Sequence, residues 1–226
     1  MENITDLQNT VARVESPKGC PWGTAFIIHD SGLLVTCAHV LIDAKVKPGQ
    51  HVYLRFVADG DTPRLAKVLE QGWEKNDKED IAFLKVEGLP VRAVVAPLLE
   101  WQGLDQESSP IPILACGFPI AKDKEIVADG KIVSYREGLA GNSELILDAK
   151  NITKGMSGGP VWDSRPGMNG VLGMVQQVYK GPEVKDTSKA TPTNEILHCT
   201  LSDWKISTQN AKRSEERRVG KECVRL

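Results

Sequence analysis

Apolar residues recur along this chain in short runs that polar or Gly/Pro-rich stretches separate. Apolar and polar positions alternate in residues 51–57, which predicts a half-buried strand. Val52, Leu54 and Phe56 form its apolar face. Residues 81–86 are almost continuously apolar, which predicts a strand that is buried on both faces. Many short strands between turn residues are typical of an antiparallel barrel.

The other predicted strands share this short length and these boundaries. They comprise residues 11–14, 24–29, 33–36, 64–69, 113–119, 130–134, 144–148, 161–162 and 170–179. Residues 24–29 and 33–36 read as a hairpin whose turn is Asp30-Ser31-Gly32. Residues 1–10 are polar, and we expect them to be frayed. The pattern as a whole predicts an all-β chain.

A short helix is predicted after the last strand. Threonine is a favourable N-cap and proline is tolerated at the first helical position, so Thr191 and Pro192 mark its start. Leu197, Leu201 and Trp204 follow at helical spacing and form one apolar face. We therefore expect this helix to pack against the strands that precede it.

The last residues, 207–226, are polar and basic and have no apolar face to bury. The string from Arg213 to Cys223 resembles the spurious ends of unrelated predicted proteins. We therefore expect a disordered or artefactual tail, and a natural chain that continues differently after about residue 210. A basic interaction arm is the alternative.

Composition and charge add limits to this picture. The 226 residues include 41% hydrophobic and 26% charged residues, which is ordinary for a soluble globular protein. The net charge of −2 gives no reason to expect nucleic acid or an anionic membrane as a partner. The N-terminal residues lack a basic region followed by an apolar one, and no apolar run reaches membrane-span length. A cytoplasmic location is the expectation.

The cysteines are odd in number and scattered. They are Cys20, Cys37, Cys116, Cys199 and Cys223. No Cys-x-x-Cys pair suggests a zinc or redox site, and there is no phosphate-binding loop. We expect reduced, mostly buried thiols, no metal and no cofactor.

The candidate chemistry centres on the segment Gly155-Met156-Ser157-Gly158-Gly159-Pro160. Glycines let the backbone turn tightly and approach a ligand closely. An exposed Oγ and free backbone N–H groups are what a nucleophilic serine needs. A Gly-rich hairpin with an incidental serine is the alternative, and a serine hydroxyl also needs a base.

A base and a carboxylate are present earlier in the chain. His39 follows the apolar run of residues 32–35, and Asp80 stands directly before the run 81–86. Asp77 and Glu79 are alternative carboxylates, which we interpret as solvated loop charges. Asp80 is preferred because a carboxylate at the start of a buried strand needs a partner, and His39 could be that partner.

In these three segments the chain resembles the chymotrypsin/trypsin-like serine peptidases, and is most similar to their bacterial and Deg-type members. The matching segments are Thr36-Cys37-Ala38-His39, Asp80-Ile81-Ala82-Phe83-Leu84 and residues 155–160, within a similarity over roughly residues 8 to 205. The resemblance implies two antiparallel Greek-key six-stranded barrels with a short C-terminal helix. The implied division is an N-terminal barrel in residues 1–101, a linker in 102–112, a C-terminal barrel with the helix in 113–206, and the tail.

The resemblance also implies roles for individual residues. His39, Asp80 and Ser157 would form the catalytic triad, and the N–H groups of Gly155 and Ser157 would form the oxyanion hole. Substrate would bind as a strand along Gln176, Gln177 and Val178.

Two further positions follow from the same comparison. Asn151 would lie at the base of the primary specificity pocket and favour a small or medium neutral side chain. Met156 stands where zymogen-activated relatives carry an aspartate, so activation by a new N-terminal ammonium is not expected.

The implied activity is that of a serine endopeptidase that acts on peptides or proteins through an acyl-enzyme. Two alternatives remain open. One is a protease-like binding or regulatory module, with C-terminal regulatory domains missing from this chain. The other is a serine esterase that uses the same triad.

Overall fold

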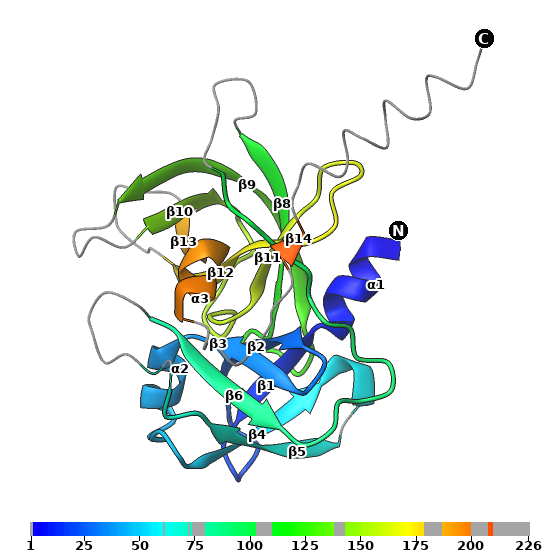
Figure 1. Cartoon of the computed structure of the whole chain (residues 1–226), viewed down its shortest axis with the longest axis vertical. Coiled ribbons are helices and arrows are strands. Elements are labelled where there is room, and N and C mark those ends of the chain that lie inside the picture. The colour runs from blue at the N-terminus through cyan, green and yellow to red at the C-terminus, as the bar shows by residue number, and fades with distance from the viewer. Residues whose placement is uncertain are drawn as a thin grey trace.

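A computed structural model describes residues 2–60, 62–71, 73, 80–102, 110–137, 143–178, 187–199 and 208–209. Two antiparallel barrels lie one above the other in Figure 1, the N-terminal barrel in blue to cyan and the C-terminal barrel in green to orange. This architecture confirms the predicted fold.

The N-terminal barrel is closed, with the strand order β1-β2-β3-β6-β5-β4. Its strands are β1 (Val11–Glu15), β2 (Pro21–His29), β3 (Leu33–Thr36), β4 (His51–Phe56), β5 (Pro63–Val68) and β6 (Ala82–Val86). The helix α2 (Ala38–Asp43) follows β3, and the 3-10 helix η1 (Val57–Asp59) follows β4. The predicted alternation in β4 holds, because Val52, Leu54 and Phe56 are all buried.

The C-terminal barrel has the strand order β11-β8-β9-β10-β13-β12, and β11 pairs with β12 to close it. Its strands are β8 (Ile111–Gly117), β9 (Ile126–Glu137), β10 (Ser143–Asp148), β11 (Pro160–Asp163), β12 (Val171–Val178) and β13 (Thr187–Pro192). Two short strands, β7 (Leu98–Leu99) and β14 (Thr208–Gln209), extend this sheet beyond β12 in parallel pairing. Through β7 this sheet includes residues that come before the predicted linker, 102–112. Residues 103–109 of that linker lie outside the described residues.

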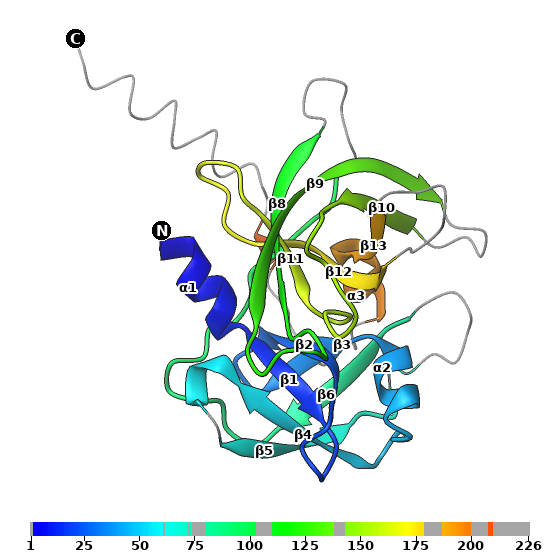
Figure 2. The same ribbon diagram turned by 180° about the vertical axis from the view of Figure 1, so that it is seen from behind.

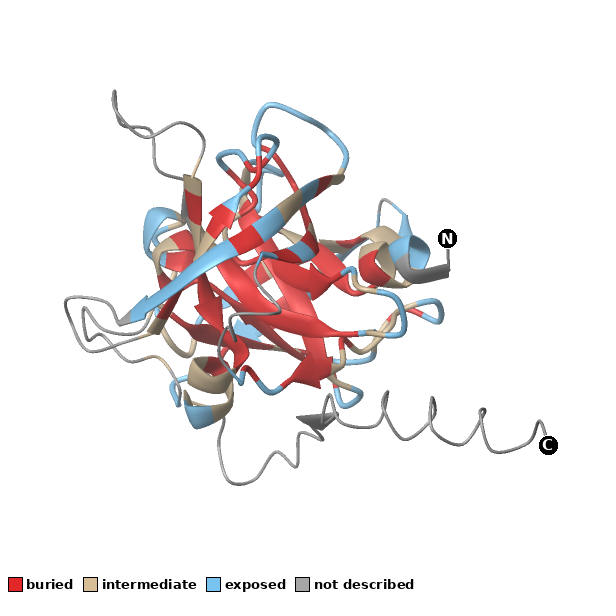
Figure 3. Ribbon diagram, turned by 90° about the horizontal axis from the view of Figure 1, so that it is seen from above, coloured by how far each residue is buried: buried red, intermediate tan, exposed pale blue. Residues whose placement is uncertain are grey.

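The inner faces of both barrels are buried, as the red strands in Figure 3 show. Burial of apolar surface is the main favourable contribution to folding, so this core keeps the strand ends in place. The ends that matter for function are those of β3, β6 and β12, together with the loop between β10 and β11.

The N-terminal residues form a helix, α1 (Glu2–Asn9), rather than a frayed end. Figures 1 and 2 show α1 beside the junction of the two barrels. Leu7 is completely buried, and the Thr10 hydroxyl donates a hydrogen bond to the Leu7 carbonyl at 2.7 Å. The prediction was wrong because one buried anchor and tertiary packing stabilise a helix whose own sequence is polar.

The C-terminal helix α3 (Thr193–Cys199) is present, but its predicted start was wrong. Thr191 and Pro192 end β13, where they pair with Met174 and Gly173. Proline is tolerated at a strand end because few ladder bonds are lost there. The Thr193 hydroxyl donates to the Leu172 carbonyl at 3.3 Å, which ties the helix to β12. The predicted Leu201 and Trp204 lie outside the described residues.

Candidate active site

His39 and Asp80 meet because β3 and β6 are antiparallel neighbours. Thr36, the last residue of β3, pairs with Ala82, the first residue of β6. The chain turns from Thr36 into α2, which carries His39, and it enters β6 from Asp80. The two side chains therefore come from segments distant in sequence that the barrel register places side by side.

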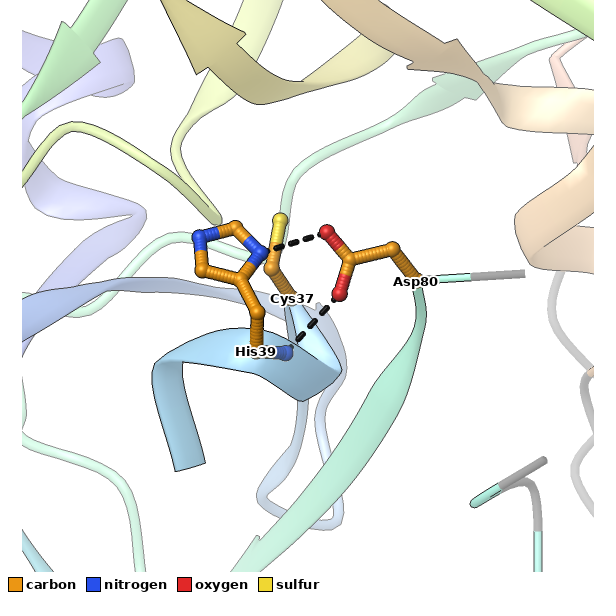
Figure 4. Close-up of side chains that lie close together, drawn as sticks. All are labelled: Cys37, His39 and Asp80. Atoms are coloured by element: carbon orange, nitrogen blue, oxygen red, sulfur yellow. Dashed lines mark hydrogen bonds and ion pairs between the residues drawn. The ribbon is translucent and has the colours of Figure 1, made fainter. Parts of the chain in front are cut away.

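Asp80 accepts two hydrogen bonds from His39. Its Oδ2 lies 2.5 Å from His39 Nδ1, and its Oδ1 accepts the His39 backbone N–H at 2.8 Å (Figure 4). This arrangement places the proton on Nδ1 and leaves Nε2 as the basic nitrogen. The alternative carboxylates Asp77 and Glu79 lie outside the described residues.

The pKa of His39 is raised from its ordinary value of 6.5 by its surroundings. Burial alone would lower the pKa, but the hydrogen bond and the negative charge of Asp80 outweigh it. The imidazolium form of His39 is thus stabilised. A general base needs this stabilisation, because it must hold a proton during turnover.

Ser157 lies in the loop between β10 and β11, which packs closely against the N-terminal barrel. The Thr24 N–H donates to the Ser157 carbonyl at 2.9 Å. Gly158 has a φ of +84°, and a Cβ there would lie 2.0 Å from the Thr24 carbonyl oxygen. Only glycine fits this position, so the Gly-Gly step after the serine is what permits the loop to approach β2.

The nucleophile loop and the His39 segment share a contact with Val175, in the middle of β12. The Val175 carbonyl accepts the Gly158 N–H at 2.8 Å and the Cys37 thiol at 3.3 Å. Gly23 lies between the two segments as well, since a Cβ there would be 2.6 Å from Val40 and 3.1 Å from the Ser157 carbonyl. Within the described part of the chain, no hydrogen bond joins Ser157 Oγ to His39.

Two backbone carbonyls before Ser157 are turned away from it by specific hydrogen bonds. The Ile120 N–H donates to the Lys154 carbonyl at 3.0 Å, and the Thr24 hydroxyl donates to the Gly155 carbonyl at 2.9 Å. In a trans peptide the N–H points opposite to the preceding C=O. The Gly155 N–H therefore points away from Ile120.

Two backbone N–H groups of this loop make no hydrogen bond within the described part of the chain. Among the described residues, neither the Gly155 N–H nor the Ser157 N–H donates a hydrogen bond to a protein acceptor. Gly155 has a φ of +100°, a conformation that L side chains rarely adopt. The strained glycine and the two free N–H groups are the arrangement expected of an oxyanion hole.

The predicted substrate strand has an edge without a described strand partner. Gln177 and Val178 pair with β13 on one side. On the other side, the pairing between β11 and β12 ends at Met174. An edge of this kind is where an extended peptide adds to a sheet, and the substrate-binding role of Gln176, Gln177 and Val178 stays a prediction.

The profile of the trypsin-like peptidase domain family matches residues 23–174. This match contains His39, Asp80 and Ser157 and covers more than half of the chain. The chain belongs to this family. It is a serine endopeptidase domain, and the family resemblance that the sequence motifs predicted is confirmed.

Several solved structures share the fold. Rv3671c from M. tuberculosis H37Rv, in the inactive form of a serine-to-alanine mutant, aligns with a TM-score of 0.64 at 18% identity, over 86% of each chain. The HtrA-type protease AlgW with a tripeptide aligns with a TM-score of 0.67 at 21% identity, over 87% of this chain and 60% of that chain. Deg5 aligns with a TM-score of 0.63 at 18% identity, over 87% of this chain and 90% of that chain. No curated protein matches the sequence.

In this trypsin-like domain Met156 is completely buried and belongs to the apolar core of the C-terminal barrel. Its thioether cannot form an ion pair. Apolar packing and backbone hydrogen bonds therefore hold the residue before Ser157. That activation needs no new N-terminal ammonium stays a prediction.

Asn151 is exposed and lines a cavity of about 460 Å³. The other lining residues come from β8, β9 and the end of β10 with the residues around them, including Asp129, Lys131 and Ser164, and no residue of β12 is among them. In the structure Asn151 therefore lies among residues that do not include the predicted substrate strand, residues 176–178. Its role at the base of the specificity pocket stays a prediction.

Cys20, Cys37 and Cys116 are free thiols; Cys37 and Cys116 are buried, whereas Cys20 is exposed. The Cys37 sulfur lies beside the imidazole–carboxylate pair in Figure 4, and the ligand atoms of Cys37, His39 and Asp80 lie within 4.8 Å of one another. Such a group could hold a metal ion only with a deprotonated thiol. Burial and the Asp80 charge raise the pKa of Cys37 well above 9.0, and the histidine and carboxylate bind each other.

No helix in the described part of the chain is long and apolar enough to cross a membrane. The cytoplasmic location stays a prediction.

Thr24 is a site residue that sequence reasoning missed. It is completely buried on β2 and contacts the nucleophile loop through both its backbone and its hydroxyl. In the sequence Thr24 stands out only as a polar residue beside a glycine in an otherwise apolar strand. This pattern does not reveal which residues the Thr24 hydroxyl binds.

Proposed function

We propose that this chain hydrolyses peptide bonds through a His39-Asp80-Ser157 triad and an acyl-enzyme intermediate. The observation that carries the proposal is the double hydrogen bond from His39 to Asp80, at 2.5 and 2.8 Å. It orients the imidazole and fixes its tautomer, so that Nε2 is free to act as a base. The loop that supplies Ser157 contacts Val175 of β12, which Cys37, two residues before His39, also contacts.

The first half of the reaction forms the acyl-enzyme. Ser157 Oγ attacks the substrate carbonyl carbon while His39 Nε2 takes the hydroxyl proton. The carbonyl oxygen becomes negative and accepts hydrogen bonds from the N–H groups of Gly155 and Ser157. The C–N bond then breaks, and His39 gives its proton to the leaving amine.

The second half repeats these steps with water. His39 Nε2 takes a proton from a water molecule, which attacks the ester carbonyl of the acyl-enzyme. The same two N–H groups stabilise the second negative oxygen, and the proton returns to Ser157 Oγ as the acid is released. Asp80 stays ionised throughout and stabilises the imidazolium of each transition state.

Peptide substrate would lie in extended form beside Gln176, Gln177 and Val178. Backbone pairing along this edge holds many sequences, and side-chain pockets then select among them. Because pairing along this edge needs an extended peptide backbone, the edge favours a peptidase over an esterase.

A fluorophosphonate probe tests the nucleophile, since it reacts with an activated serine alone. The wild-type chain should be labelled at Ser157, and Ser157→Ala should not be. Cleavage of a peptide library, read by mass spectrometry, then separates a peptidase from an esterase. A labelled chain that hydrolyses only esters would contradict the endopeptidase assignment, and an unlabelled folded chain would support a binding or regulatory module.

A further inference from the structure

We propose that Thr24 is a positioning residue for the oxyanion hole. Its hydroxyl, supplied by the N-terminal barrel, fixes the Gly155 peptide so that the hole in the C-terminal barrel stays formed. This inference rests on the proposed function, because it assigns the Gly155 and Ser157 N–H groups to the substrate oxygen.

The contacts of Thr24 surround the nucleophile loop. Its N–H donates to the Ser157 carbonyl at 2.9 Å. Its hydroxyl donates to the Gly155 carbonyl at 2.9 Å and accepts the Phe118 N–H at 3.0 Å. Its own carbonyl accepts the Thr36 hydroxyl at 2.6 Å. One side chain thus joins β2, the nucleophile loop and the segment after β8.

The hydroxyl has no water available as a substitute partner. Thr24 is 0% exposed, and both groups that its hydroxyl binds belong to buried residues. Loss of the hydroxyl would leave the Gly155 carbonyl and the Phe118 N–H without this partner. A buried polar group without a hydrogen bond is costly, so the loop would move to find another partner.

Gly155 is the residue in this loop that can move most easily. Glycine populates both signs of φ, so its flanking peptides can rotate without a steric penalty from a side chain. The Ile120 N–H holds the peptide before Gly155 at the Lys154 carbonyl, and Thr24 holds the peptide after it. The peptide that Thr24 holds lies between the two peptides that carry the Gly155 N–H and the Ser157 N–H, so its rotation would change the direction of one donor relative to the other.

The residue before the nucleophile adds a backbone restraint but no charged one, because the Met156 N–H donates to the Thr153 carbonyl at 3.1 Å. Met156 is buried in apolar surroundings, so an ion pair of the kind that a carboxylate would form does not hold the loop. Neutral hydrogen bonds therefore determine the shape of the hole. Thr24 supplies two of them from the other barrel, from its N–H to the Ser157 carbonyl and from its hydroxyl to the Gly155 carbonyl, and the second depends on the side chain.

The test compares Thr24→Val with Thr24→Ser in the full chain. Valine keeps the shape of threonine and removes the hydroxyl, whereas serine keeps the hydroxyl. Thr24→Val should lower kcat by about tenfold to a hundredfold with a smaller change in KM, which is less than the roughly 10²–10³-fold cost of removing an oxyanion donor itself. Thr24→Ser should stay within about threefold of the wild type, within the scatter of a mutation that keeps the hydrogen bond.

The affinity for an inhibitor distinguishes a positioning role of Thr24 from a merely structural one. A peptide aldehyde forms a tetrahedral adduct on Ser157 whose oxygen enters the hole, whereas the product peptide only occupies the substrate strand. Thr24→Val should weaken aldehyde binding by about the same factor as kcat and leave product binding nearly unchanged.

Thr10→Val is the matched control. Thr10 is also completely buried, and its hydroxyl also donates to a backbone carbonyl, that of Leu7 at 2.7 Å, but at the junction of α1 and β1. It should lower Tm and leave kcat and aldehyde affinity unchanged. If Thr24→Val does not fold, Thr24→Cys replaces it, because a thiol is a weaker donor and should give an intermediate kcat.

The outcomes separate this inference from the proposed function. A wild-type chain that the fluorophosphonate probe does not label would contradict the proposed function itself. An active wild type together with a folded Thr24→Val of unchanged kcat and aldehyde affinity would overturn the role of Thr24. Equal losses in Thr24→Val and Thr24→Ser would overturn it too, because the hydroxyl would then not matter.

Discussion

Asp80 holds His39 at two separate atoms, one on the imidazole and one on the backbone. The Nδ1–Oδ2 distance is 2.5 Å, and the His39 N–H lies 2.8 Å from Oδ1. The second bond fixes the position of the carboxylate relative to the start of α2, and the first fixes the ring relative to the carboxylate. The direction of the basic nitrogen is therefore set by the register between β3 and β6.

Asp80→Asn should lower kcat by about 10⁴-fold, because an amide can present its N–H to the ring and favour the wrong tautomer. Asp59→Asn is the control, since Asp59 pairs with Arg64 at 2.7 Å within the N-terminal barrel. Peptide hydrolysis should be normal in the control. A mild effect of Asp80→Asn, together with a large effect at Asp77 or Glu79, would show that another carboxylate serves His39.

The pH profile should show activity rising as His39 loses its proton, with a midpoint above the ordinary value of 6.5. Protonated His39 cannot accept the serine proton, so activity is lost on the acid side. Asp80→Asn should move the midpoint to lower pH, because the carboxylate is what raises this pKa. A midpoint of kcat/KM that stays in place in Asp80→Asn would contradict this assignment.

The contribution of the His39 proton to the free energy of unfolding should fall as pH rises, whereas activity should rise. The folded chain holds the His39 proton more tightly than the unfolded chain does. The resulting stabilisation is fully present below the unfolded pKa and fades as pH rises through the raised folded pKa. Urea unfolding of the wild type and Asp80→Asn across this range should show the difference between them shrinking toward high pH.

Ser157→Ala should lower kcat by roughly 10⁶-fold, by analogy with triad knockouts in another protease. Tm should change little, because the backbone contacts of Ser157 with Thr24 remain. Ser164→Ala, at an exposed serine after β11, is the control and should keep full activity. Probe labelling that persists in Ser157→Ala would place the nucleophile elsewhere.

Gly155→Ala and Gly167→Ala form a matched pair, because both glycines have positive φ, +100° and +82°. A Cβ at Gly155 would lie 2.4 Å from the Phe118 carbonyl oxygen, whereas one at Gly167 would meet no atom within 4 Å. Both variants should lose about 1–2 kcal/mol of stability from the left-handed conformation. Only Gly155→Ala should also lower kcat, by roughly 10²–10³-fold as the hole is distorted. Equal kcat values in the two variants would contradict the position of the hole.

The proposed triad could be chosen from the sequence because each member lies in a short local pattern: His39 after a strand, Asp80 before a strand, and Ser157 among glycines. The choice of Asp80 over its neighbours rested on its place beside a buried strand, and the hydrogen bonds to His39 agree with it. By contrast, the role of Thr24 depends on partners more than ninety residues away in the sequence. A local pattern does not encode such partners.

The missed elements have the same explanation. β13 has few apolar residues and ends in Pro192, and it is a strand because β10 and β12 pair with it from both sides. α1 is a polar segment that the burial of Leu7 stabilises. In both cases tertiary contacts override weak local propensity, and a single sequence shows only the propensity.

N-terminal processing should not be required for activity. In zymogen-activated relatives a new ammonium pairs with an aspartate before the nucleophile, but here Met156 occupies that place and is completely buried among apolar residues. A chain with an uncleavable N-terminal extension should therefore react with a fluorophosphonate probe at about the same rate as the unextended chain. Met156→Leu should behave like the wild type in both forms, since leucine keeps the volume and the apolar contacts. Met156→Asp should lower Tm in both forms, because a carboxylate buried there without a partner is costly. Labelling that appeared only after the extension was removed would show that a free N-terminus shapes the oxyanion hole after all.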